Sequence, residues 1–233
     1  MQRQAAAQPG LGTEVEIGSI DGELRRLWEA DQTSTKASLI NFAVYSEHPD
    51  ALSRNTRMIG EIARTHACRA LLIGARLDAG PSSARAWITA HCNLVGGHKA
   101  VCSEQIAFEL VGKAIGRIRN IVFAHLDSDL PLVFWWQGPF SRIFEPRLYG
   151  LVDRLIVDSC DWEELAGGLD TLAEALRRAP APLVVHDLSW SRCYQLRLAF
   201  AMLFDSERAQ RELRHPRGLA LDFRSGRRPT ALL

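Results

Sequence analysis

Four short, almost continuously apolar runs constrain the fold of this chain more than any other feature. They lie at residues 37–45, 69–75, 132–136 and 154–158. A strand that faces solvent on one side alternates apolar and polar residues, whereas a strand covered on both faces is apolar throughout. The four runs therefore predict buried strands, and the helical patterns between them predict helices that cover the sheet.

Two longer runs in the middle of the chain predict a β-hairpin. Residues 84–94 and 101–111 are strand-like, and a short loop with Gly96 and Gly97 joins them. Such a connection pairs its two strands antiparallel. The expected fold class is therefore α/β, with a mixed, mostly parallel sheet that includes an antiparallel hairpin and has helices packed on it.

Helices are expected at four places in this domain. Pro49 opens one that ends near His66, and residues 113–127 and about 189–205 are also helical in pattern. Asp161 and Glu164 have the spacing of a capping box, which predicts a helix from Asp161 to about residue 178. The alternation of strands and helices gives no sign of an internal repeat.

The chain divides into three parts. Residues 1–36 are polar and poorly patterned, which predicts a mobile arm with one short helix around residues 22–30. Residues 37–205 form the α/β domain. Residues 206–233 form an arginine-rich tail with seven arginines and three acids. A strand-like patch at residues 219–223 makes this tail resemble the start of a second domain.

Composition narrows the function classes. The 233 residues carry a formal net charge of +1, which favours neither a nucleic-acid nor a membrane partner. No apolar run approaches the roughly 20 residues of a membrane-spanning helix. The five cysteines are odd in number and scattered, and no secretory signal precedes them. We therefore expect a cytoplasmic protein with reduced thiols.

Catalytic motifs do not stand out in the sequence. The glycine-rich loops that hold nucleotide phosphates are absent, and so is the Gly-x-Ser-x-Gly elbow of the hydrolases. Ser103 beside Glu104, and Ser159 beside Asp158, are neighbours on strands and so face apart. We therefore expect a protein that is not an enzyme and has no cofactor.

Two alternatives remain open at this stage. One is an enzyme for a small phosphorylated sugar, with Arg154 and Ser159 as phosphate contacts. The other is a zinc-stabilised structural domain, because the hairpin carries four residues of the types that bind zinc: His91, Cys92, His98 and Cys102. Their spacing matches no zinc signature, and adjacent strand residues point to opposite faces.

The most unusual local feature is a pair of tryptophans at the end of an apolar run. Trp135 and Trp136 should face opposite sides of the sheet, either as two core anchors or with one of them at a binding edge. Asp158 and Ser159 follow the next run, and they emerge at the same edge if the strands are parallel. They could equally satisfy backbone donors at a helix start.

Several of these segments, taken in order, resemble one family. The segments are Val101-Cys102-Ser103-Glu104-Gln105-Ile106, Asp129-Leu130-Pro131 leading to Trp135-Trp136, Asp153-Arg154-Leu155-Ile156-Val157-Asp158-Ser159, and Asp187-Leu188-Ser189-Trp190 leading to Phe204-Asp205. The chain resembles the OpcA family, the glucose-6-phosphate dehydrogenase assembly proteins, over about residues 36–205. The family usually continues into a second α/β domain, so the resemblance is to a C-terminally shortened member.

The resemblance implies a non-catalytic protein that binds glucose-6-phosphate dehydrogenase and acts as an assembly factor and allosteric activator. It would promote the active oligomer of that enzyme in the oxidative pentose phosphate pathway, with no cofactor of its own. It also implies redox modulation in some members, for which Cys102 and Cys160 are the residues to test. The candidate partner-binding residues are Trp135, Trp136, Asp153, Arg154, Asp158, Ser159, Glu104 and Trp190.

Overall fold

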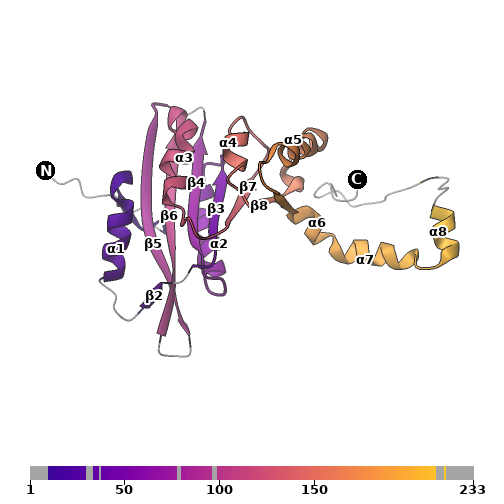
Figure 1. Ribbon diagram of the computed structural model, residues 1–233, viewed down its shortest axis with the longest axis horizontal. Helices are drawn as coiled ribbons and strands as arrows, with labels where there is room; N and C mark the ends of the chain where they lie inside the picture. Colours follow the sequence, from indigo (N-terminus) through magenta and orange to yellow (C-terminus); the bar gives the residue numbers. More distant parts are fainter. Residues whose placement is uncertain are drawn as a thin grey trace.

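A computed structural model describes residues 10–29, 34–36, 38–77, 80–95, 99–213 and 218. Its centre is one sheet in the order β1-β5-β6-β4-β3-β7-β8-β9, with β2 beside one end of β6 (Figure 1). The strands are β1 (Thr13–Val15), β2 (Ser34–Lys36), β3 (Asn41–Ser46), β4 (Arg69–Arg76), β5 (Ser83–Val95), β6 (Lys99–Val111), β7 (Leu132–Gln137), β8 (Arg154–Val157) and β9 (Val184–Asp187).

The pairing of these strands confirms the predicted fold class. From β6 through β4, β3, β7 and β8 to β9, every neighbouring pair is parallel. The predicted hairpin is β5 and β6, which pair antiparallel over their full lengths. The short β1 adds a further antiparallel neighbour to β5. The sheet is therefore mixed and mostly parallel, as the apolar runs and the hairpin pattern indicate.

Helices cover the two faces unequally. The helices are α1 (Ile20–Glu29), α2 (Ala51–Ile62), α3 (Ile118–Ile121), α4 (Pro146–Tyr149), α5 (Leu165–Arg178), α6 (Leu188–Arg192), α7 (Tyr194–Leu203) and α8 (Glu207–Leu213). The larger core lies under α1, α3, α4 and α5, through Leu24, Ile118, Leu148 and Leu172. A smaller core lies under α2, where Ile59 packs among residues of β3 and β4.

The tryptophan pair shows how the strands connect these two cores. Trp136 belongs to the larger core, whereas Trp135 packs against the smaller one from the opposite face. Side chains alternate across a strand, so consecutive residues of β7 must separate in this way. The sequence prediction of opposite faces is confirmed.

Two expected helices differ in the structure. The capping-box prediction is wrong, because residues Ser159–Asp161 form a 3-10 turn and α5 begins only at Leu165. Trp162 turns into the larger core between them, and a continuous helix would carry it away from that position. The helix expected at residues 113–127 is a 3-10 turn (Gly112–Arg117), the short α3 and a second 3-10 turn (Phe123–His125).

The N-terminal part differs from the expected mobile arm from residue 10 onward. Thr13–Val15 pairs with β5, and α1 buries Ile20 and Leu24 in the larger core. Ser34–Lys36 pairs with β6. The expected helix around residues 22–30 corresponds to α1. Residues 1–9 and the strand-like patch at 219–223 lie outside the described residues.

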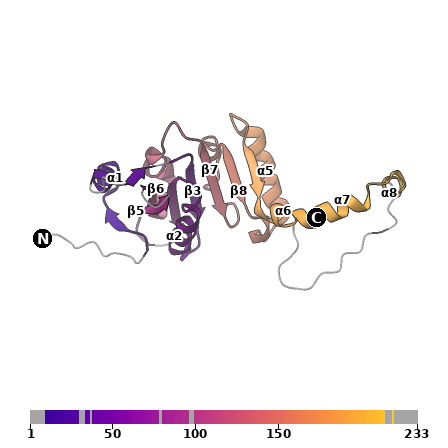
Figure 2. The same cartoon turned by 90° about the horizontal axis from the view of Figure 1, so that it is seen from below.

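The C-terminal helices leave the body of the molecule. The helix expected at residues 189–205 is divided at Cys193 into α6 and α7, and α8 follows. Figures 1 and 2 show α7 and α8 projecting away from the sheet beyond β9. Among the described helices, none is long and apolar enough to cross a membrane.

Candidate partner-binding edge

The order of the strands places a switch point between β3 and β7. The chain runs from β3 through α2 to β4 on one side, and later returns to β7 on the other side. Ser46 and Gln137, the last residues of β3 and β7, are direct neighbours in this parallel pair. In open α/β sheets, the loops diverge at such a point and leave a crevice beyond the carboxyl ends of the strands.

A cleft of about 670 Å³ lies at this point. It is lined by residues from the ends of β3 and β7, the start of α2 and the turn after β8: Ser46, Glu47, His48, Pro49, Arg54, Trp135, Gln137, Gly138, Pro139 and Asp161. Trp135 is the sequence-predicted residue that lines the cleft. Its indole nitrogen is buried and has no hydrogen-bond partner among the described residues.

Polar contacts hold the walls of this cleft in place. Asn55 of α2 and Gln137 exchange two amide hydrogen bonds of 3.0 Å each, which tie the helix to the end of β7. The Tyr45 hydroxyl donates to the Glu47 carboxylate at 2.8 Å, and burial is the main cause that raises the pKa of this tyrosine. Arg54 is exposed at the rim and makes no ion pair with the described residues. The cleft therefore offers an aromatic wall and a free cation.

Trp136 packs in the larger core behind this edge and is not part of its surface. Only 1% of it is exposed, and its ring stacks on Tyr45 with 4.2 Å between the centroids. Its indole nitrogen donates to the Pro139 carbonyl at 3.0 Å, which fixes the turn after β7. Of the two tryptophans, Trp135 lines the cleft and Trp136 is a core anchor.

Asp158 and Ser159 lie at the same edge, as predicted from parallel strands. Their polar groups form hydrogen bonds with neighbouring residues where β8 and β9 end. The backbone nitrogen and the hydroxyl of Ser159 donate to the Asp187 carboxylate at 3.0 and 2.7 Å. Asp158 accepts from the Cys160 nitrogen at 3.2 Å and from Arg192 at 2.6 Å. The contact with Asp158 is the main cause that raises the pKa of Arg192. These bonds join the ends of β8 and β9.

Asp153 and Arg154 lie at the opposite edge of the sheet. Arg154 is the first residue of β8, and the Asp153 carboxylate accepts from the Leu132 nitrogen at 2.7 Å. Trp190 of α6 is 53% exposed, and the Arg197 guanidinium stacks over its ring at 3.6 Å. These candidate residues are therefore distributed over three places, and Glu104 lies in a fourth, so they do not form one patch.

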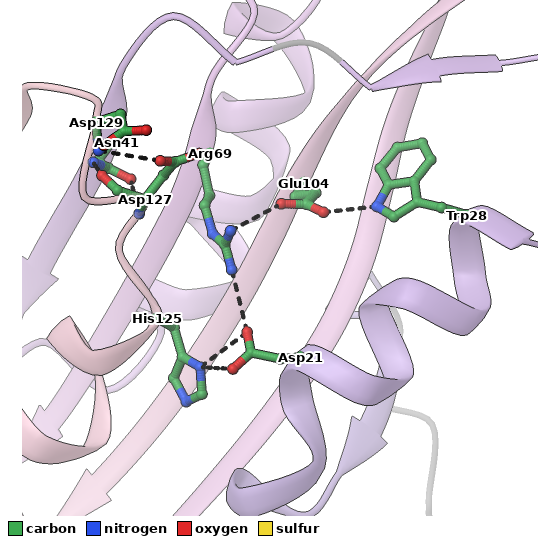
Figure 3. Close-up of polar contacts among 8 residues, drawn as sticks. All are labelled: Asp21, Trp28, Asn41, Arg69, Glu104, His125, Asp127 and Asp129. Carbon is green, nitrogen blue, oxygen red and sulfur yellow. Dashed lines mark hydrogen bonds and ion pairs between the residues drawn. The ribbon is translucent and has the colours of Figure 1, made fainter.

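Glu104 belongs to a separate polar cluster on the face under α1 (Figure 3). It is 1% exposed and accepts a 2.6 Å hydrogen bond from the Trp28 indole. Arg69 lies 3.6 Å from Glu104 and 3.5 Å from Asp21, and His125 lies 3.4 Å from Asp21. These contacts connect α1 to β4 and β6 beside an open pocket of about 540 Å³. Glu104 therefore holds α1 in place and is not exposed to a partner.

The cysteines depart from the expectation of reduced thiols. Cys92 and Cys102 lie directly opposite on β5 and β6 and form a disulfide. The sequence could not show this, because the pairing depends on the register of the hairpin. Cys68 is a buried thiol, and burial raises its pKa to about 11. Cys160 is a half-buried thiol.

Because Cys92 and Cys102 form this disulfide, neither can be a ligand in the zinc site considered as an alternative. Metal binding requires thiolates, and neither sulfur is available as one. The His91 ring contacts the Gln105 amide oxygen at 3.0 Å, and His98 lies outside the described residues. No group of three His, Cys, Asp or Glu side chains in the described part of the chain could hold a metal ion.

Sequence reasoning found Trp135 but missed its neighbours in the cleft. Arg54 and Gln137 come from other elements, and only the strand order brings them together. The one local signal was the polar segment at residues 46–49 directly after the β3 run.

The fold and this edge define an α/β domain with a cleft at its switch point. Residues 60–174 match the family model OpcA_G6PD_assem, described as the glucose-6-phosphate dehydrogenase subunit N-terminal domain. This match is to the OpcA family, and it confirms the resemblance found in the sequence. The match includes β7, β8 and five of the ten cleft residues, and Arg54 lies outside it. Searches of curated proteins and of solved structures gave no match.

Proposed function

We propose that this chain binds glucose-6-phosphate dehydrogenase and promotes its active oligomer, without chemistry of its own. The observation that carries the proposal is the family match over residues 60–174, whose description names that enzyme. Such an activator acts in the cytoplasm, at the entry to the oxidative pentose phosphate pathway. To activate, it must bind the active form of the dehydrogenase more tightly than the inactive form.

The proposed contact is the cleft edge between β3 and β7. Trp135 supplies a large half-buried ring that lines the cleft, and tryptophan is a frequent hot spot of protein interfaces. Arg54 supplies an exposed charge that makes no ion pair within the described part of the chain. Trp136 and the Ser159–Asp187 corner hold the strand ends behind this surface. Trp190 extends the candidate surface beyond β9.

The geometry disfavours the alternative of a sugar-phosphate enzyme at Arg154 and Ser159. Arg154 begins β8 and Ser159 follows its end, so the two side chains lie at opposite edges of the sheet. The Ser159 hydroxyl already donates to Asp187 and the residue is 3% exposed. These two residues cannot hold one phosphate together.

The test is dehydrogenase activity against glucose-6-phosphate concentration, with the enzyme from the same genome, with and without this chain. We expect a lower half-saturation or a higher maximal rate, and co-elution of the two proteins on a sizing column. Trp135→Ala and Arg54→Glu should weaken both effects. Arg57→Glu is the matched control, because Arg57 is exposed on the same helix but does not line the cleft.

The outcomes separate the function from its location. If folded parent protein neither co-elutes nor changes the kinetics, the proposed function is wrong. If the parent activates and the two cleft variants activate equally well, the function holds and the cleft is not the contact.

A further inference from the structure

Helix α7 is apolar around its whole circumference and is uncovered. Only Gln195 and Arg197 interrupt its ten residues, and none of the ten is buried. Its large apolar side chains are between 42% and 68% exposed: Tyr194, Leu196, Leu198, Phe200, Met202 and Leu203. A helix of this composition is ordinarily buried within a protein, and an apolar patch of this size marks an interaction site.

The sheet has an uncovered face close to the start of this helix. Leu155 and Val157 of β8 point into the larger core under α5, so Arg154 and Ile156 point to the other face, where Arg154 is exposed and Ile156 is half-buried at the margin of the smaller core. Beside them in register lie Val184 and His186 of β9, and both are exposed. Helix α2 covers β3 and β4 on this side, and none of the described helices covers β8 and β9.

A parallel strand of an α/β sheet is normally covered on both faces, so this face lacks one helix. The helix that follows β9 in the chain is the natural candidate. In the structure α6 and α7 instead continue away from the body, as both views show (Figures 1 and 2). Within the described residues, each copy of the chain therefore carries an apolar helix and a β8–β9 face that no other described helix covers.

We propose that α7 of one copy packs on the β8–β9 face of a second copy, and that the chain forms a two-fold dimer by this exchange of helices. The exchange is reciprocal, because each copy donates a helix and receives one. Every large apolar side chain of α7 and Val184 of β9 is at least 42% exposed, so helix and sheet face both carry apolar surface that a second copy can cover. In such a dimer the two α7 helices can also contact each other. This second contact accounts for the apolar residues on more than one side of α7.

The first experiment is sedimentation equilibrium of the full chain without any other protein. We expect a mass twice the 26.0 kDa of the chain. Phe200→Asp on the helix and Val184→Asp on the face should each raise the dissociation constant at least tenfold. Leu39→Asp is the control, because Leu39 is 73% exposed before the start of β3 and belongs to neither α7 nor the β8–β9 face. It should leave the dissociation constant unchanged.

The second experiment identifies what covers the face. Phe200→Cys and Val184→Cys are placed on separate chains, in a background that lacks the half-buried Cys160 and Cys193 thiols. Mild oxidation of the mixed chains should give a covalent dimer. With both substitutions on one chain, a cross-link at monomer mass would show that α7 folds back on its own sheet, and the proposal would be overturned.

A parent protein that stays monomeric at 100 times the protein concentration of the activity assay would also overturn the proposal. Neither measurement involves the dehydrogenase, so failure of the dimer leaves the proposed function untouched. The converse holds as well, because a dimer can form whether or not the chain activates that enzyme.

Discussion

The indole nitrogen of Trp28 donates a 2.6 Å hydrogen bond to the carboxylate of Glu104, which lies 76 residues further along the chain. Arg69 approaches the same carboxylate from the neighbouring strand at 3.6 Å, in register with it. Glu104 is almost fully buried, so its charge depends on these partners. The contact fixes the C-terminal end of α1, while Leu24 fixes its middle in the core.

Trp28→Phe should therefore destabilise the protein more than the lost ring area explains. The substitution keeps an aromatic ring but removes a donor to a buried carboxylate, a contact worth about 1.5–3 kcal/mol. Urea denaturation should show a lower midpoint with an unchanged slope. Glu23→Gln is the control, because it breaks only the exposed Glu23–Arg26 pair and should cost under about 0.5 kcal/mol. Equal effects of the two substitutions would contradict the assigned role of Glu104.

Asp187→Ala should destabilise the corner where β8 and β9 end. The carboxylate accepts from the nitrogen and hydroxyl of Ser159 and from the nitrogen of Ser189. Its loss leaves three donors without this acceptor, all of them on the two buried residues Ser159 and Ser189, and should cost about 2–4 kcal/mol. Ser159→Ala removes one of these bonds and should cost about 1 kcal/mol. Thermal unfolding followed by circular dichroism measures both, and a smaller loss for Asp187→Ala than for Ser159→Ala would refute the assignment.

The Cys92–Cys102 disulfide should contribute a limited stabilisation that a reductant removes. The bond closes a loop with a sequence separation of 10 inside a hairpin that is already paired, so its contribution is at most about 3 kcal/mol. Cys92→Ser/Cys102→Ser should have the melting temperature of the reduced parent and no response to dithiothreitol. Alkylation after unfolding should label three cysteines in the unreduced protein and five after reduction. Five labels without reductant would show that the bond does not form.

The Glu14–Arg85 pair should make the attachment of β1 depend on pH. Arg85 donates two hydrogen bonds to Glu14, at 2.9 and 2.8 Å, and they hold the pKa of this carboxyl below its ordinary value of 4.5. A lowered pKa in the folded state means that the pair stabilises above the unfolded pKa and loses this effect as the pH falls through the folded one. The contribution is at most about 1 kcal/mol, since Arg85 is partly exposed.

Melting temperatures of the parent and of Glu14→Gln should therefore differ at neutral pH and converge below about pH 4. Glu16→Gln removes an exposed carboxylate two residues further on and should follow the parent throughout. A constant difference between the parent and Glu14→Gln down to pH 3 would contradict the assigned pairing.

Strands that are buried on both faces could be predicted from the sequence, because nearly all of their residues must then be apolar. The runs that became β3, β4, β7 and β8 are central strands of this kind. β1 and β2 have three residues each, too few for a periodic pattern, and they depend on pairing with β5 and β6. β9 was missed because its outer face is polar or exposed at every second residue.

The candidate site was predictable only in part, for a related reason. Trp135 and Trp136 were recognisable because consecutive strand residues face apart, whatever the rest of the fold does. Arg54 and Gln137 meet Trp135 only because β3 lies between β4 and β7, and strand order leaves no local trace in the chain. Glu104 lies in one of the segments that carry the family resemblance. It is nevertheless buried under α1 and therefore is not at the surface, and the sequence could not show that α1 covers it.

Two adjacent glycines in the first turns of α5 should respond to alanine with opposite signs. A Cβ built on Gly168 would lie 2.3 Å from the Trp162 ring, which is buried beneath the helix. A Cβ on Gly167 meets no atom within 4 Å and points to solvent. Gly168→Ala must displace the ring and should cost about 1–3 kcal/mol, whereas Gly167→Ala should stabilise by about 0.5–1 kcal/mol through its better helix propensity. Urea denaturation of the two variants beside the parent measures both effects under one condition. A stabilised Gly168→Ala variant would show that Trp162 does not pack beneath α5, and would place the start of this helix differently.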